Sequence, residues 1–262
     1  MANVRSLLPK VDEIDAIAQL NAAQIISITE TWLTNAIPDR AVNVPNFILM
    51  RKDRSHCNKS IGGGICAYVH NSIPAERLTN FELPDPLKPY RLPRHTSTII
   101  LGVIYHPPSA KADDNEILIE HINFNVDSIL NKYPDALIVL TGDFNPSSTN
   151  ISLSNLARGS GLTQLVKVPT RRNNILDWCL VNKPKLFEEP VQLPNIGSSG
   201  HFSIMINPSA PNPVIRERHA CKREMKDSNV RAFGRWICNT TIRGVGFLMR
   251  MIAKINLTPF MN

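Results

Sequence analysis

Several polar side chains stand where short apolar segments of the sequence begin or end. Taken singly, each is typical of a loop residue that caps a turn. Taken together, they indicate a site, because layered α/β folds build their sites from polar groups at strand ends that face one crevice. Carboxylate and amide oxygens among them are ligands that suit Mg²⁺ or Mn²⁺. In chain order these residues are Glu30, Tyr105, Asp143, Asn145, Asp177 and His201.

The apolar segments themselves predict buried strands that alternate with helices. Apolar residues recur at helical spacing over about 10–22 and again over 118–130, which predicts two amphipathic helices. Short apolar runs with turn residues beside them predict strands. This alternation favours a layered α/β architecture over a sandwich of hairpins. The predicted strands cover 25–28, 65–69, 97–105, 136–140, 175–181 and 202–206.

Composition excludes several classes of protein. Hydrophobic residues make up 43% of the 262 residues and charged residues 19%, which is enough apolar material for a packed core. No apolar run approaches the roughly 18 residues that a membrane span requires, and the start of the chain lacks the pattern of a signal peptide. The 5 cysteines include no CxxC pair, which favours a reducing, intracellular location over a disulfide framework.

Charge and proline divide the chain into three parts. Residues 1–208 hold 19 Lys+Arg and 19 Asp+Glu, so the whole excess of +7 lies beyond them. The segment 207–215 carries three prolines and predicts a linker between a domain at 1–206 and a basic, partly helical tail at 216–262. The tail is either a solvated extension or a contact for nucleic acid. A second segment, 82–95, carries four prolines and predicts an irregular surface connection.

The order of several motifs resembles the endonuclease/exonuclease/phosphatase family, and within it the apurinic-endonuclease-like module of non-long-terminal-repeat retrotransposons. ETWL and GDFN in this order are the most specific motifs. The resemblance implies two packed β-sheets flanked by helices, a divalent metal ion, Mg²⁺ or Mn²⁺, and DNA as the partner. It covers about 1–206, with a weaker match at RAFGRWI (231–237). The matching stretches include NVRSLLPKVDEI (3–14), IISITETWL (25–33), GGGICAYV (62–69), YRLPR (90–94), STIILGVIYHPP (97–108), LIVLTGDFNPS (137–147), LVKVPTRRNNILDWCLVN (165–182) and SSGHFSIMI (198–206).

The resemblance also implies roles around the metal ion. Glu30 matches the carboxylate that holds the ion, and Asn3 matches an Asn beside it. Such an ion neutralises charge on the phosphate that is cleaved. Asp143 matches the residue that positions or deprotonates the attacking water, and Asn145 matches a residue that orients the phosphate or Asp143.

Four further residues match family positions that line the same cleft. Tyr105 matches a tyrosine that hydrogen bonds near the phosphate, although it could also be a core tyrosine whose hydroxyl is satisfied. Thr170 and Asp177 match a Thr/Asp pair of the cleft, and Thr170 could also be a simple turn residue. His201 matches the histidine that donates to a phosphate oxygen as negative charge builds up.

The chain departs from the family pattern in two places. The family has Ser-Asp-His before its last core strand, whereas this chain has Gly200 in the place of the Asp. An Asp there is expected to fix the imidazole of His201, so we predict impaired turnover. The chain also starts two residues before Asn3, which predicts that the first strand is missing, and the short segment at 81–90 predicts the loss of a second strand.

Three functions remain open at this point. The first is Mg²⁺-dependent nicking of DNA by a retrotransposon endonuclease, which would act in the nucleus. The second is a degenerate, non-catalytic module that binds nucleic acid through its tail, as the missing strand and Gly200 suggest. The third is another phosphoesterase of the superfamily. The sequence indicates neither a membrane partner nor an oligomeric state.

Overall fold

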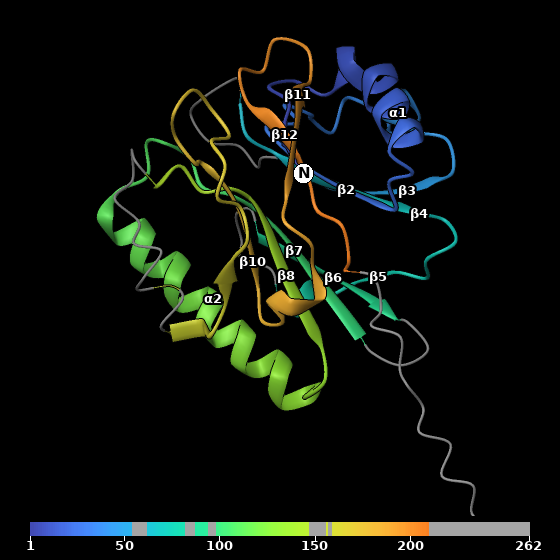
Figure 1. The fold of residues 1–262 in the computed structure, drawn as a ribbon. Coiled ribbons are helices and arrows are strands. Elements are labelled where there is room, and N and C mark those ends of the chain that lie inside the picture. Colours follow the sequence, from blue (N-terminus) through green and yellow to red (C-terminus); the bar gives the residue numbers. More distant parts are fainter. Residues whose placement is uncertain (54–61, 82–86, 94–97, 147–155, 157–158, 210–262) are drawn as a thin grey trace, which may run out of the picture. The chain divides into compact units, whose positions relative to one another are not determined.

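Two β-sheets pack face to face, and one α-helix covers the outer face of each (Figure 1). The computed structural model describes residues 1–53, 62–81, 87–93, 98–146, 156 and 159–209, which belong to one unit, Met1–Ala210. None of the helices in these ranges is long and apolar enough to cross a membrane. The predicted architecture of two packed sheets with flanking helices is confirmed.

The first sheet has four strands, in the order β1-β2-β4-β3. Only β1 and β2 run parallel; the other pairs are antiparallel. The strands are β1 (Ala2–Asn3), β2 (Ile25–Thr29), β3 (Phe47–Lys52) and β4 (Ile65–His70), and helix α1 (Val11–Leu20) lies on this sheet.

The second sheet has six strands, in the order β5-β6-β7-β8-β10-β9. Its helix is α2 (Ala112–Lys132), and a separate two-stranded sheet joins β11 and β12. The six strands are β5 (Glu76–Arg77), β6 (Leu87–Pro93), β7 (Thr98–Tyr105), β8 (Leu137–Asp143), β9 (Thr163–Gln164) and β10 (Asp177–Val181). The remaining elements are β11 (Val191–Asn195), β12 (Phe202–Met205) and the 3₁₀ helices η1 (Leu8–Lys10), η2 (Asp39–Val42), η3 (Thr79–Phe81) and η4 (Pro184–Leu186).

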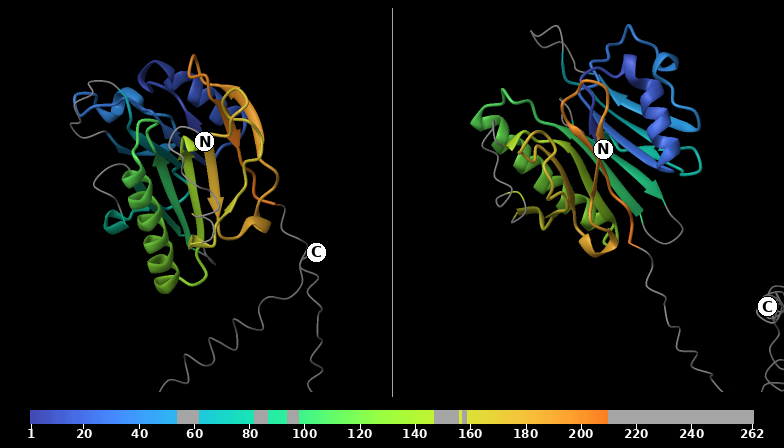
Figure 2. Two further views of the ribbon diagram at one scale, coloured as in Figure 1. Left: turned by 90° about the vertical axis from the view of Figure 1, so that its left-hand side faces the viewer. Right: turned by 45° about the horizontal axis from the view of Figure 1, so that its top comes forward.

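The alternation of side chains along the central strands explains the layers. Ile65 and Ala67 of β4 pack against Leu101 and Val103 of β7, and this contact fills the space between the two sheets. The intervening residues of β4 face the α1 layer, and the intervening residues of β7 face α2. Because both faces of β4 and β7 are covered, their sequences read as continuous apolar runs. Figure 2 shows α2 lying along the six-stranded sheet.

The first strand requires a correction. The sequence predicts that it is missing, but Ala2 and Asn3 pair in parallel with Ile28 and Thr29 of β2. The chain continues this contact, since the amide of Val4 donates to the carbonyl of Thr29 over 3.1 Å. A strand of two residues is therefore enough to place Asn3 beside the end of β2.

The proline-rich stretch 82–95 is a second correction. It is not a wholly irregular connection, because Leu87–Pro93 form β6 and pair with β7 from Thr98 to Ile104. β5 pairs only with Tyr90 and Arg91, so most of β6 is an edge on that side, where a strand tolerates proline. The strand predicted to be lost is therefore present. Sequence periodicity also missed β3 and β11.

The predicted linker and tail fall mostly outside the described residues, so they stay predictions. The structure describes only 207–209 of the linker. These residues lie against the η4 region, where Pro208 forms a bridge with Phe187 and the amide of Ser209 donates to the carbonyl of Leu186 over 2.9 Å.

Candidate active site

Strand register places three of the predicted residues side by side at one end of the six-stranded sheet. Tyr105 of β7 is the register partner of Asp143 in the parallel pair β7–β8. Asp177 of β10 is the partner of the same Asp143 in the antiparallel pair β8–β10. The three residues therefore form a row across adjacent strands, and two of them are carboxylates directly opposite each other, an arrangement that is unfavourable if both are charged.

Asp143 is buried and closely held. Its Oδ2 accepts from the side-chain amide of Asn3 over 2.9 Å, and its Oδ1 accepts from the backbone amide of Asn145 over 3.3 Å. Burial raises the pKa of Asp143 to about 7, and the neighbouring charge of Asp177 adds to the shift, while His201 and the hydrogen bonds from Asn3 and Asn145 oppose it. Asp143 can therefore take up and release a proton near neutral pH.

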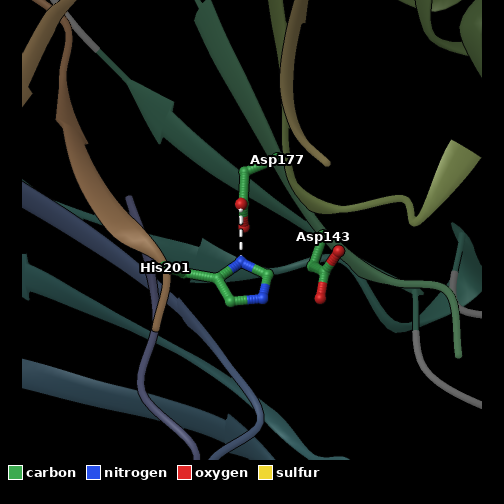
Figure 3. A group of neighbouring side chains, drawn as sticks. All are labelled: Asp143, Asp177 and His201. Atoms are coloured by element: carbon green, nitrogen blue, oxygen red, sulfur yellow. Dashed lines mark hydrogen bonds and ion pairs between the residues drawn. The ribbon is translucent and has the colours of Figure 1, made fainter. Parts of the chain in front are cut away.

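Asp177 and His201 form a second buried pair. Nδ1 of His201 lies 2.8 Å from Oδ2 of Asp177 (Figure 3). Burial by itself would lower the pKa of His201, but the hydrogen bond and charge of Asp177, with the charge of Asp143, raise it above its usual value. Figure 3 also shows Asp143 on the side of the other ring nitrogen, Nε2.

The pair corrects the interpretation of Gly200. The sequence led us to expect that His201 lacks a carboxylate partner because Gly200 replaces an Asp. Asp177 supplies that partner instead, so Gly200 gives no reason to expect impaired turnover. Gly200 adopts a left-handed φ of +75°, and a Cβ built on it meets no atom within 4 Å. The position is thus open and is not needed to orient the imidazole.

Thr170 connects the segments that carry this pair. Its hydroxyl accepts from the amides of Leu176 and Asp177 over 2.9 and 3.1 Å, and its carbonyl accepts from the amide of Phe202 over 2.7 Å. The side chain is fully buried. Thr170 therefore holds Asp177 and the start of β12 together and does not face the pocket.

Glu30 reaches the site from the other sheet, on a strained loop. Its φ is +58° and that of Trp32 is +54°, values that non-glycine residues seldom adopt. Oε2 of Glu30 accepts from the amide of Gly63 over 2.7 Å and from the indole N–H of Trp32. Trp32 is half-buried and fixes this carboxylate.

One pocket of about 330 Å³ joins the two sides. Asp177 and Thr170 are predicted site residues that do not line it; they lie behind and support His201. The lining also includes residues that sequence reasoning did not assign to the site, among them Arg5, Trp32 and Arg171. The NVRSL, ETWL and PTRR motifs contain these residues, but nothing in their spacing distinguishes them from surface or core residues. The predicted residues in the lining are Asn3, Glu30, Tyr105, Asp143, Asn145 and His201.

The pocket offers suitable ligands for a divalent metal ion. Oδ1 of Asn3 is buried and has no hydrogen-bond partner within the described ranges, although Nδ2 of the same amide donates to Asp143. A hard cation would satisfy an unpaired buried amide oxygen in a pocket that Glu30 and Asp143 also line. Ligand atoms of Asp143, Asp177 and His201 also lie within 4.8 Å of one another, which is a spacing that could hold an ion.

No protein-family model matches the sequence, and no match was found among curated proteins. Solved structures, by contrast, match with probability 1.00. The endonuclease domain of TRAS1, a telomere-specific non-LTR retrotransposon, superimposes with a TM-score of 0.60 at 15% identity, over 80% of this chain and 97% of that one. The chain has the endonuclease/exonuclease/phosphatase fold.

Other structures with this fold are similarly close. An AP endonuclease from Archaeoglobus fulgidus gives a TM-score of 0.54 at 11% identity, over 79% of this chain and 97% of that one. The 3′ phosphatase NExo from Neisseria, solved with a product DNA hairpin, gives 0.57 at 12% identity, with the same coverage. The fold is thus shared with proteins named for nuclease or phosphatase activity, and the fold that the resemblance at ETWL and GDFN implies is confirmed.

Proposed function

We propose that the protein is a nuclease that requires a divalent metal ion, Mg²⁺ or Mn²⁺, and hydrolyses a phosphodiester bond in DNA. The observation that supports this most directly is the assembled pocket. It brings the unpaired oxygen of Asn3, the carboxylates of Glu30 and Asp143, and the paired imidazole of His201 to one place, although these residues come from both sheets.

The roles follow from these contacts. Glu30, Oδ1 of Asn3 and Asp143 would hold the ion. When bound, such an ion neutralises charge on the phosphate that is cleaved. Asp143 positions a water molecule and takes its proton as the water oxygen forms a bond to phosphorus.

The remaining groups act on the phosphate and the leaving group. His201, held in one orientation by Asp177, donates from Nε2 to a phosphate oxygen. Asn145 and Tyr105 orient the phosphate. The bond to the leaving sugar oxygen breaks, and solvent supplies the proton that this oxygen takes up.

We further infer that the DNA is a chromosomal target strand that the enzyme nicks, as in a retrotransposon module, and that the protein acts in the nucleus. The fold shared with the TRAS1 domain and the retrotransposon-like motifs of the sequence support this interpretation. The partnered imidazole favours a catalytic protein over a degenerate remnant.

A plasmid-nicking assay tests the proposal. The full chain is expected to convert supercoiled plasmid into open circles with Mg²⁺ and not with EDTA. Asp143→Asn is expected to lower the rate by about 10²–10⁴-fold, since it removes the group that takes the proton. Glu30→Gln is expected to weaken the dependence of the nicking rate on Mg²⁺, because it removes a carboxylate proposed to hold the ion. Circular dichroism controls for folding. Nicking at the parental rate by both variants would contradict the assignment.

A further inference from the structure

Two arginines line the pocket without an internal partner. Arg5 and Arg171 are exposed, and neither guanidinium group forms a hydrogen bond or an ion pair in the part of the chain that the structure describes. Arg51 shows the contrast: it pairs with Asp39 over 3.1 Å and Asp53 over 3.3 Å and belongs to the fold. Arg5 and Arg171 are thus free to bind something from outside.

The backbone that carries Arg5 is fixed even though its side chain is free. Its φ is +44°, in the left-handed region. Lys10 donates from Nζ to the carbonyls of Val4 and Arg5, the latter over 3.2 Å, and the amide of Ser6 donates to the carbonyl of Glu30 over 2.8 Å. These hydrogen bonds hold the backbone of residue 5 in one conformation, so the side chain leaves the loop from a fixed point beside the pocket.

The backbone that carries Arg171, on the six-stranded side of the pocket, is also fixed by hydrogen bonds. Its amide donates to the carbonyl of Asn174 over 3.1 Å, and the amide of Asn174 donates back over 2.9 Å, so a closed turn presents the side chain. The turn directly follows Thr170, whose hydroxyl accepts a hydrogen bond from the amide of Asp177. The charge of Arg171 is also close enough to His201 to act against protonation of the imidazole.

We propose that Arg5 and Arg171 bind phosphates of the substrate strand next to the one that is cleaved, one arginine from each sheet. The inference rests on the proposed function, because it takes the pocket to receive the scissile phosphate. Guanidinium groups suit this task because they bind phosphate oxygens through two parallel hydrogen bonds. The two carboxylates Glu30 and Asp143 would otherwise repel a polyanion, and the arginines offset them at the pocket rim.

The turn provides a matched control. Arg172 is the next residue, is also exposed and also has a left-handed φ, of +51°, but it does not line the pocket. Arg171→Gln and Arg172→Gln therefore remove the same charge from adjacent positions. If the charge of the turn alone attracted DNA, both substitutions would have the same effect.

The test measures binding of a fluorescently labelled DNA duplex to the full chain by anisotropy, in EDTA, from 50 to 200 mM salt. Each phosphate contact contributes about −0.9 to the slope of log affinity against log salt. Arg5→Gln and Arg171→Gln should each make the loss of affinity over this fourfold salt range about 3.5-fold smaller than in the parent. Arg172→Gln should leave it unchanged. Thermal unfolding midpoints check that each variant is folded.

The outcomes separate this inference from the proposed function. Parental slopes in Arg5→Gln and Arg171→Gln overturn the inference even if the parent nicks plasmid. Equal effects of Arg171→Gln and Arg172→Gln overturn it as well, because they show a general charge effect. If Arg5→Gln and Arg171→Gln reduce the slope and the parent binds DNA but never nicks it, the phosphate contacts are supported and only the catalytic proposal is refuted. A parent that binds no DNA refutes both.

Discussion

The two sides of the pocket position their functional groups by different means. On the six-stranded sheet, regular strand register aligns Tyr105, Asp143 and Asp177, and ordinary β geometry is enough. On the four-stranded sheet, Glu30 and Trp32 lie on a loop with left-handed φ values, held by hydrogen bonds from Gly63 and from Trp32 itself. Tyr105, Asp143 and Asp177 are thus placed by strand register, whereas Glu30 and Trp32 are placed by a strained loop. Asn145, which follows β8, also has a left-handed φ, of +47°.

This difference shows where each side is vulnerable. The regular side places two carboxylates opposite each other in a buried environment, and its cost is electrostatic. The loop side accepts residues in sparsely populated conformations, each of which costs about 1–3 kcal/mol. A change on the regular side should therefore alter proton chemistry, whereas a change on the loop side should alter the binding of the metal ion.

The largest effect in this comparison is expected from Asp177→Asn. An amide can still contact Nδ1 of His201, but it removes the charge that raises the imidazole pKa. We expect turnover to fall by about 10–100-fold, the usual effect of losing a carboxylate that orients a site histidine. Single-turnover nicking across pH should also show the limb assigned to His201 moving to lower pH. A uniform loss of rate with no movement of that limb would point to misfolding instead.

Trp32→Phe tests the loop side. Phenylalanine keeps an aromatic side chain but removes the indole N–H that donates to Oε2 of Glu30. We expect about tenfold weaker binding of Mn²⁺, measured by calorimetry on the full chain, because such supporting contacts contribute about 10–100-fold to metal affinity. The unfolding midpoint in EDTA serves as the control. Unchanged Mn²⁺ affinity would mean that Gly63 alone holds the carboxylate.

The pH dependence of stability follows from the regular side. The pKa of Asp143 is raised to about 7 in the folded protein, so the folded state binds this proton more tightly than the unfolded state does. Its contribution to stability is complete below the unfolded pKa and is lost as pH rises through about 7. The raised pKa of His201 acts in the same direction at higher pH. In EDTA, the unfolding midpoint should therefore fall from pH 5 to pH 8, and it should fall less in Asp143→Asn.

The smallest effect is expected from Gly200→Asp. Asp177 already orients His201. A carboxylate that orients a site histidine changes the rate by at least about tenfold, so a second carboxylate at position 200 should change the nicking rate by less than that. The substitution introduces no close contact, and Asp tolerates left-handed φ better than most residues. An increase of 100-fold or more in single-turnover rate would show that the pairing with Asp177 is not sufficient.

The same contrast explains how much the sequence could predict. Apolar runs predicted β2, β4, β7, β8, β10 and β12, and polar residues at their ends identified Asp143, Asp177 and His201. On the loop side, the polar residue after β2 identified Glu30, but nothing in the sequence indicated the left-handed backbone of Glu30 and Trp32 or the contact between them. The partner of His201 was missed: the contact with Asp177 joins residues 24 apart in the chain, and only the folded arrangement of β10 and β12 shows it.

Thr170 links the motions of the two segments that carry Asp177 and His201. Three amide groups, those of Leu176, Asp177 and Phe202, donate to this one residue. Because Thr170 is buried and accepts from all three amides, a movement of Thr170 away from its place releases them together. The acid and the imidazole should therefore become exposed in a single opening event, so that the pair is lost or kept as one cooperative unit.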